Sequence, residues 1–163
     1  MTLSYLSLGS NLGDRLGNLK SAVAKLREKV AVISLSSVWE TAPIDCPAGS
    51  SAFLNMVVSC EHELSARELL SFTQSIEKEL GRPDEHEKNS PRTCDIDILT
   101  FEDESVNEPD LTVPHPRMKE RLFVLAPLRE IQKEKFPYQT EYSSLLGSQE
   151  IRLFAPPLVL QQA

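Results

Sequence analysis

Two aspartates alternate with apolar residues within residues 91–99, PRTCDIDIL. In a β-strand successive side chains point to opposite faces, so Asp95 and Asp97 would share one face, with Cα atoms roughly 6.6 Å apart. Both carboxylates could then reach one pair of hard cations. Arg92 stands just before them, with a charge suited to phosphate. Carboxylates that bind Mg²⁺, next to arginines that bind phosphate, are the chemistry of nucleotide-dependent phosphoryl transfer.

Each of these residues also has a purely structural interpretation. A bare Asp-x-Asp pair is common on a solvated strand face, and Arg92 could form an ion pair with Asp95 or Asp97. Arg82 follows a predicted helix and could cap its last carbonyls. His115 has a proline on either side, which fixes its direction, and it could donate to a phosphate or simply pack.

A second pattern concerns an amide in apolar surroundings. Phe53 and Asn55 fall on the same face of a predicted strand at residues 53–60. Burying an unpaired amide costs about 1–3 kcal/mol, so Asn55 needs a partner. A heteroaromatic ring could supply one at its polar edge while Phe53 stacks on its face. A core asparagine bonded to backbone is the structural alternative.

These residues must be positioned by one domain, which we expect to comprise residues 1–163. Strands are predicted at 3–9, 30–40, 53–60 and 94–101, with the second interrupted at Ser36 and Ser37. Helices are predicted between them, at 16–30 and from the capping box Ser65–Glu68 to Gly81. A third helix should start near Met118 and break or kink at Pro127. The order βαββαβ predicts an α+β, ferredoxin-like core over about residues 3–131, an antiparallel sheet with helices on both faces. No element is predicted for 138–163.

Composition limits the function classes. A net charge of −7 gives the chain no overall attraction for nucleic acid or an anionic membrane, and no apolar run is long enough to span a bilayer. The three cysteines are widely spaced and have no CxxC pattern, so we expect reduced thiols and a cytoplasmic protein. The apolar stretch at residues 1–9 has no basic lead and no small-residue cleavage site, so we expect no signal peptide. His62 and His86 have no pattern around them and are assigned to the surface. The segment GSNLGDR at residues 9–15 is neither a Walker loop nor a dinucleotide fingerprint.

Five motifs in one order then resemble a known family. They are LGSNLGDR (8–15), ETAP (40–43), FLN (53–55), PRTCDIDIL (91–99) and VPHPRM (113–118). Together they resemble the 6-hydroxymethyl-7,8-dihydropterin pyrophosphokinases of folate biosynthesis, over about residues 3–131. The resemblance implies that ATP gives its β,γ-pyrophosphoryl group to the pterin's hydroxymethyl oxygen and leaves as AMP.

The same resemblance implies a role for individual residues. Two Mg²⁺ ions would be bound by Asp95 and Asp97, which with Arg82 and Arg92 form the catalytic set. ATP would be bound by Gln74, Glu77, Arg92, Ile98, Thr112, His115 and Arg121. The pterin would be bound by Ala42, Pro43, Phe53, Asn55, Asp95 and Phe123, stacked between the two aromatic rings. Asp95 would either bind metal alone or also handle the acceptor hydroxyl.

The chain departs from the family pattern in places. Asn89 and Ser90 stand where many members have Trp-Gly, in the charged loop 82–91 that family members close over substrates. Asp110 stands where some members have a basic residue near the nucleotide. The partners implied are small molecules, with no nucleic acid and no membrane, and we expect a monomer. Two alternatives stay open: another Mg²⁺-dependent nucleotidyl or phosphoryl transferase, and a non-catalytic ferredoxin-like module that binds a ligand.

Overall fold

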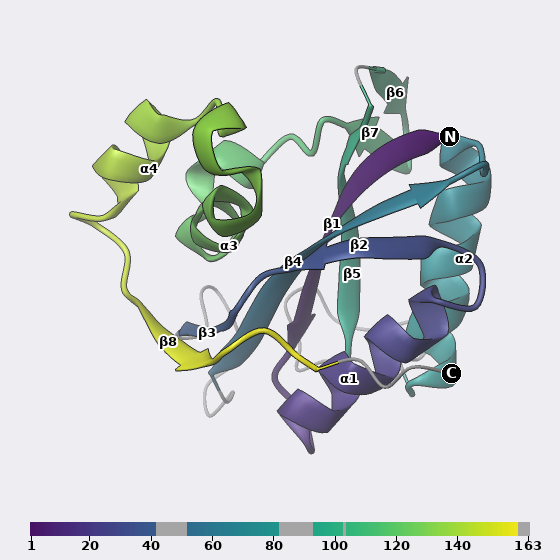
Figure 1. Ribbon diagram of the computed structural model, residues 1–163, viewed down its shortest axis with the longest axis horizontal. Helices are drawn as coiled ribbons and strands as arrows, with labels where there is room; N and C mark the ends of the chain where they lie inside the picture. Colours follow the sequence, from purple (N-terminus) through teal and green to yellow (C-terminus); the bar gives the residue numbers. More distant parts are fainter. Residues whose placement is uncertain (42–51, 82–92, 103, 160–163) are drawn as a thin grey trace.

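A computed structural model describes residues 1–41, 52–81, 93–102 and 104–159. In these ranges six strands form one antiparallel sheet: β1 (Thr2–Ser10), β2 (Ala31–Leu35), β3 (Val38–Thr41), β4 (Phe53–His62), β5 (Asp95–Phe101) and β8 (Ile151–Ala155). The strand order is β5-β1-β4-β3-β8, and β2 also pairs with β4. Two short strands, β6 (Val106–Glu108) and β7 (Leu111–Val113), form a separate ribbon. The predicted α+β, ferredoxin-like arrangement is confirmed (Figure 1).

The second predicted strand is interrupted where the sequence indicated. β2 ends at Leu35 and β3 starts at Val38, and both pair with β4. Between them the backbone N–H of Ser36 donates to the carbonyl of Val57 at 3.0 Å, while the Ser36 hydroxyl accepts from the N–H of Val57 at 2.9 Å. The serine side chain therefore replaces a backbone carbonyl at the bend and keeps the edge of β4 satisfied.

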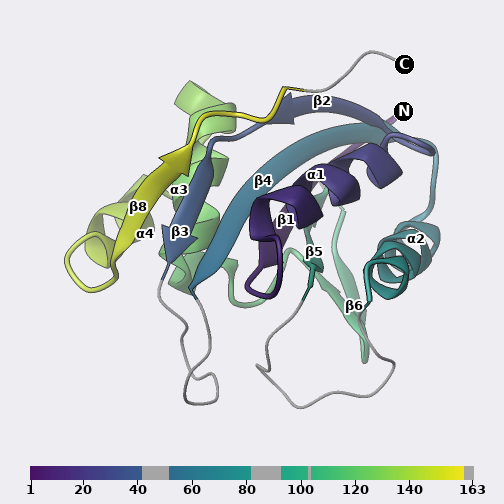
Figure 2. The same cartoon turned by 90° about the horizontal axis from the view of Figure 1, so that it is seen from below.

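Helices α1 (Arg15–Leu26) and α2 (Ala66–Glu79) cover one face of the sheet (Figure 2). The Asp14 carboxylate caps α1, and Ser65 with Glu68 forms the predicted capping box of α2. Gly81, at φ +103°, follows the end of α2 in a conformation that favours glycine. Apolar side chains of both helices pack with one face of β1, β4 and β5 in the larger hydrophobic cluster.

The other face is covered by η1 (Met118–Glu120), α3 (Leu122–Gln132), η2 (Lys133–Lys135) and α4 (Gln139–Leu145) (Figure 1). A smaller cluster packs Val57 and Leu99 of the sheet against α3. Glu130 of α3 is bonded to the sheet as well, since its carboxylate accepts from the backbone and hydroxyl of Ser37 and from the indole N–H of Trp39. The prediction of helices on both faces is confirmed.

The third predicted helix differs from the structure in two respects. Its α-helical part starts at Leu122, because a 3₁₀ turn fills 118–120 and Arg121 is extended. Pro127 lies inside α3, which continues to Gln132, so of the predicted break or kink the break is wrong. An interior proline costs a helix about 3 kcal/mol. Burial of Leu122, Val124, Leu125, Ala126, Pro127 and Leu128 offsets that cost.

The assignment of His62 to the surface is wrong. His62 is only 2% exposed, its Nε2 lies 2.9 Å from the Ser4 hydroxyl, and its Nδ1 accepts from the backbone N–H of Leu64. Burial lowers the pKa of His62 and favours the neutral ring. His86 lies outside the described residues.

Two further expectations concern the cysteines and the membrane. Cys60 and Cys94 are both buried, and burial raises the pKa of the Cys60 thiol to about 12, so Cys60 acts as a packing residue. Cys46 lies outside the described residues. Within the described part of the chain, each helix is too short or too polar to cross a bilayer.

Candidate active site

One row of paired residues crosses four strands of the sheet on the α3 side. Gly9 of β1 pairs with Asp95 of β5 on one side and with Asn55 of β4 on the other, and Asn55 pairs in turn with Trp39 of β3. Directly opposed residues of antiparallel strands present their side chains on the same face. Asp95 and Asn55 therefore face the same way, with backbones about 10 Å apart and only a glycine between them.

Gly9 suits this row because its neighbours leave little room for a side chain. A Cβ atom on Gly9 would lie 3.1 Å from Oδ1 of Asn55 and 3.6 Å from Cδ1 of Phe53. The first distance is shorter than an ordinary van der Waals contact, so a methyl group would displace the Asn55 amide. The GSNLGDR motif thus opens with a residue that lets the predicted pterin side chains approach the backbone of β1.

Asn55 itself is held by one side chain. It is 3% exposed, and its Nδ2 donates to the Thr41 hydroxyl at 2.9 Å, across the β3–β4 pair. Phe53 is half-buried two residues away on the same face. The described partner of the amide is therefore a side chain of the ETAP motif, and the amide is held in one orientation beside Gly9.

Asp95 and Asp97 lie on the same side of β5, both half-buried. Their neighbours Cys94, Ile96 and Ile98 point into the larger core cluster on the opposite face, as the alternation predicted. Ile98, predicted near the nucleotide, is thus only 5% exposed and lies on the α1–α2 side, away from the two carboxylates.

The helix α2 contacts the aspartate strand through Glu77. Its carboxylate accepts from the backbone N–H of Ile96 at 2.8 Å, midway between Asp95 and Asp97. Gln74 lies three residues earlier on the same side of the helix and is exposed. Glu77 is therefore at the outer edge of β5, next to the carboxylate pair, and Gln74 is its neighbour on the helix.

His115 is positioned by two backbone bonds. Its own N–H donates to the carbonyl of Leu99 in β5 at 2.9 Å, and its Nδ1 accepts from the N–H of Arg117 at 3.2 Å. Burial lowers the pKa of His115, nearby Arg121 lowers it further, and Asp95 opposes them. Because Nδ1 accepts, the neutral ring carries its proton on Nε2 and can donate it.

Arg121 joins the two halves of the site. Burial lowers the pKa of Arg121, and the charges of Asp97 and Asp95 oppose that shift, which means that the guanidinium lies within electrostatic reach of both carboxylates. Its Cζ also lies 5.5 Å from the centroid of the Phe123 ring, in a cation–π contact. The structure thus brings a predicted phosphate residue, a predicted pterin residue and the aspartates together at the start of α3.

Several predicted residues are not part of this group. Thr112 is exposed on the ribbon strand β7. Asp110, in the turn before it, forms an ion pair with Arg67 of α2 at 2.7 Å. Four predicted site residues lie outside the described residues: Ala42, Pro43, Arg82 and Arg92.

A contact that sequence reasoning missed joins the first two motifs. The Arg15 guanidinium donates to the Glu40 carboxylate and to the carbonyl of Ala52, each at 2.8 Å. Arg152 of β8 donates to the same carboxylate at 2.6 Å. Bonds first from Arg15 and then from Arg152 hold the pKa of Glu40 below its usual value. Glu40 and Arg15 both stand in recognised motifs, but Arg152 has no pattern that could have revealed it.

The donor set fits one kind of metal site. Among the described residues, no cluster of three or more His, Cys, Asp or Glu side chains could enclose an ion. Mg²⁺ needs no such cluster, because one or two carboxylates commonly hold it while waters and substrate phosphates complete its octahedron. Asp95 and Asp97, half-buried on one strand face, match that pattern.

The fold and this site together define a compact α+β domain with the side chains of a nucleotide-dependent transferase. The chain belongs to the 7,8-dihydro-6-hydroxymethylpterin-pyrophosphokinase family, whose model matches residues 5–133. It is 50% identical over 131 residues to the 2-amino-4-hydroxy-6-hydroxymethyldihydropteridine pyrophosphokinase of Bacillus subtilis, covering 79% of this chain and 77% of that one. The protein of the same name from Aquifex aeolicus is 39% identical over 132 residues, 81% of each chain.

Solved structures support the fold. The crystal structure of wild-type Plasmodium falciparum HPPK-DHPS superposes with a TM-score of 0.68 at 16% identity, covering 90% of this chain and 45% of that chain. A crystal structure of HPPK-DHPS in complex with substrates gives a TM-score of 0.67 at 17% identity. This chain therefore spans less than half the length of those two proteins, and the likeness concerns the fold.

Proposed function

We propose that this protein transfers the β,γ-pyrophosphoryl group of ATP to 6-hydroxymethyl-7,8-dihydropterin through the row Asp95–Gly9–Asn55. The hydroxymethyl oxygen attacks the β-phosphorus, the bond from that phosphorus to the α,β-bridging oxygen breaks, and AMP leaves. The hydroxyl proton passes to solvent or to a carboxylate. The observation that carries the proposal is the row itself, because it sets a carboxylate and an oriented amide on one face with a bare glycine between them.

The nucleotide end of the row belongs to Asp95 and Asp97. Two Mg²⁺ ions held there would neutralise the phosphates and stabilise the entering and leaving oxygens. The protein's own contribution is a half-buried strand face that fixes both carboxylates, with Glu77 holding the backbone between them. Little covalent chemistry is asked of the side chains, since phosphoryl-type transfer depends mainly on positioning and charge.

The phosphates have two donors among the described residues. Neutral His115 offers Nε2–H, and Arg121 offers a planar guanidinium for two oxygens. We propose Arg82 and Arg92 as further phosphate contacts that complete the catalytic set. Gln74 and Glu77 border the nucleotide from α2 and Thr112 from the ribbon. Ile98 is buried, so a nucleotide contact there would use its backbone.

The pterin end belongs to Asn55 and two aromatic rings. A pterin presents adjacent donors and acceptors at its edge, which match the carbonyl and amide groups of an asparagine. Phe53 and Phe123 would stack on its two faces, and the backbone at Ala42 and Pro43 would read the remaining polar edge. Asp95, at the other side of Gly9, is the carboxylate nearest to the hydroxymethyl group along the row.

We also propose that the protein acts as a cytoplasmic monomer on small molecules alone. Three widely spaced cysteines without a CxxC pattern suit a reducing compartment. An acidic chain without overall affinity for nucleic acid or anionic membrane suits the substrates named here. Size-exclusion chromatography with light scattering would test the monomer, and a mass of 36 kDa instead of 18.2 kDa would refute it.

The deciding experiment is a product assay with ATP, Mg²⁺ and 6-hydroxymethyl-7,8-dihydropterin. We expect AMP and a pterin pyrophosphate in equal amounts. ADP as the nucleotide product would instead indicate a phosphoryl transferase. Absence of any product, with retained pterin binding, would indicate the non-catalytic module.

A further inference from the structure

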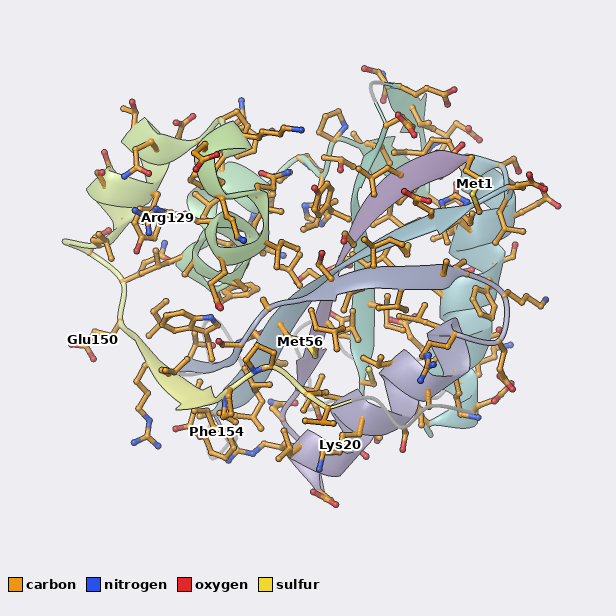
Figure 3. The ribbon with its side chains drawn as sticks, viewed as in Figure 1. Met1, Lys20, Met56, Arg129, Glu150 and Phe154 are labelled. Atoms are coloured by element: carbon orange, nitrogen blue, oxygen red, sulfur yellow. The ribbon has the colours of Figure 1, made fainter. Side chains whose placement is uncertain are left out.

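The segment after the family match folds back onto the site. Residues 134–163 lie beyond the matched range 5–133. Within them α4 leads to β8, which pairs with β3 at the sheet edge (Figure 1). The connection between α4 and β8 is bonded to the start of α3. Glu150, labelled in Figure 3, marks this connection, and Gln149 precedes it.

Gln149 makes two backbone bonds that flank a single residue. Its Oε1 accepts from the N–H of Leu122 at 2.9 Å, and its Nε2 donates to the carbonyl of Glu120 at 2.8 Å. The residue between those two peptide groups is Arg121, which is extended at φ −122°, ψ 108°. Both hydrogen-bonding ends of one amide are thus used to hold the backbone on either side of Arg121.

The bond from the N–H of Leu122 to Gln149 gives α3 the N-terminal cap that it otherwise lacks. The first N–H groups of a helix have no partner inside it and need a cap. Arg121, the N-cap residue of α3, makes no side-chain capping bond. Gln149 therefore caps α3 from outside, at the point where the chain turns from η1 into the helix. That turn sets the direction of Arg121 and, two residues later, of Phe123.

The same glutamine lines a cavity together with the residue that holds Asn55. A cavity of about 570 Å³ is lined by Thr41, Leu122 and Gln149, among other residues. Thr41 is the partner that orients Asn55, and Leu122 lies between Arg121 and Phe123. The cap is therefore close to the residues proposed for both substrates, whereas an ordinary helix cap could be anywhere on the surface.

We propose that Gln149 is a positioning residue for pyrophosphoryl transfer, which fixes the backbone on both sides of Arg121 so that its guanidinium faces the phosphates. The inference rests on the proposed function. It assigns a role in the reaction to a segment outside the family match, and the role is indirect, because Gln149 acts through Arg121.

The first test is a double-mutant cycle on kcat/KM for ATP. We expect Gln149→Ala to lower kcat/KM between about 10- and 100-fold, as a displaced phosphate ligand would. In an Arg121→Ala background the same change should cost less than about threefold, because the residue through which it acts is gone. The matched control is Gln139→Ala, which removes a glutamine with two side-chain bonds from the same segment, to Arg129 and Ser143. It should retain wild-type kcat/KM.

A merely structural cap predicts a different result. Gln149→Ala would then lower the melting temperature but leave kcat/KM of the folded protein unchanged, or lower it equally in both backgrounds. Either result would overturn the proposal. Gln149→Glu is the second variant, because it keeps the acceptor for Leu122 and loses the donor for Glu120. Gln149→Glu should lower kcat/KM less than Gln149→Ala does. If Gln149→Ala does not fold, Gln149→Glu replaces it in the double-mutant cycle with Arg121→Ala, and an unchanged kcat/KM would then overturn the proposal.

The second test does not depend on activity. The ¹⁵N–¹H heteronuclear NOE of the Arg121 side-chain Nε reports how firmly its guanidinium is held. It should fall in Gln149→Ala and remain unchanged in Gln139→Ala. An equal NOE in all three proteins would refute the positioning role. If the wild-type protein releases no AMP, the proposed function fails, while this measurement still decides whether Gln149 holds Arg121.

Discussion

The two faces of the sheet are built from the same strands and are used differently. Toward α1 and α2, β4 presents Leu54, Met56, Val58 and Cys60, each at most 1% exposed. Toward α3, the same strand presents Phe53, Asn55 and Val57, and only Val57 belongs to the smaller hydrophobic cluster. The α1–α2 face of β4 is therefore apolar from Leu54 to Cys60, and the other is divided between a core and a polar site.

This difference shows where the domain can tolerate polar groups. A buried amide such as Asn55 costs about 1–3 kcal/mol unless it is bonded. Thr41 supplies that bond, and the larger cluster on the opposite face supplies most of the apolar burial. Alternation along a strand thus lets neighbouring residues serve stability and chemistry separately, which can be tested one residue at a time.

The largest expected effect is on the site face. Asp97→Asn should lower kcat about 1,000-fold, since it removes half of the carboxylate pair proposed to bind metal. The free energy of unfolding should change by less than about 1 kcal/mol, because the residue is half-buried on a strand face. Steady-state kinetics and urea unfolding measure the two quantities. Glu61→Gln, in β4, is the control and should retain full activity; retained activity in Asp97→Asn would refute the metal assignment.

The core face should respond in the opposite way. Met56 is fully buried in the larger cluster, next to Asn55 in sequence, and is labelled in Figure 3. Met56→Ala should lower the free energy of unfolding by about 2–5 kcal/mol through loss of burial and a cavity. The KM for pterin, measured on the folded fraction, should stay within about twofold. A change in KM that matches that of Asn55→Ala would mean that the two faces are not independent.

An effect of intermediate size is expected for a substitution of Gly9, which lies on the site face. Gly9→Ala places a methyl group 3.1 Å from Oδ1 of Asn55, so the amide must move. We expect pterin affinity, measured by calorimetry, to fall about tenfold, with little change in ATP affinity. Gly147→Ala is the control, because its nearest neighbour would be 3.8 Å away. Equal weakening of both substrates would indicate a general disturbance of β1.

The smallest effect concerns pH and the buried histidine. Burial lowers the pKa of His62 below the value of about 6.5 that it has in the unfolded chain. As pH falls through 6.5, the unfolded chain takes up the proton first, so protonation favours unfolding. Stability should therefore be full above pH 7 and decline toward pH 5. His62→Gln should show a flatter dependence of melting temperature on pH, and an unchanged slope would exclude His62 as a cause.

Local patterns in the sequence predicted the site strand and its faces well. Alternation placed Asp95 and Asp97 on one side of β5 and Ile96 on the other, because a strand has a fixed period of two. The capping box of α2 and the interruption of the second strand at Ser36 were likewise predicted, since each depends on residues close together in the chain.

Contacts between residues far apart in the chain could not be predicted from the sequence. The partner of His62 is Ser4, 58 residues away, and nothing near either residue indicates the pair. Pro127 suggested a helix break because its local cost is known, whereas the compensating burial comes from a cluster that includes Val57 and Leu99 of the sheet. β8 is a short strand with little pattern, and its place is decided by the open edge of β3. Gln149 depends on that placement and so could not be predicted.

The position of β5 has a consequence for self-association. Within the described sheet it is the last strand on its side, and such a strand offers unpaired backbone groups to other molecules. Here the N–H of Ile96 donates to the Glu77 carboxylate, and the carbonyl of Leu99 accepts from the N–H of His115. Two residues proposed to surround the nucleotide thus also block strand addition, so that a change at Glu77 would expose a docking edge for a second chain.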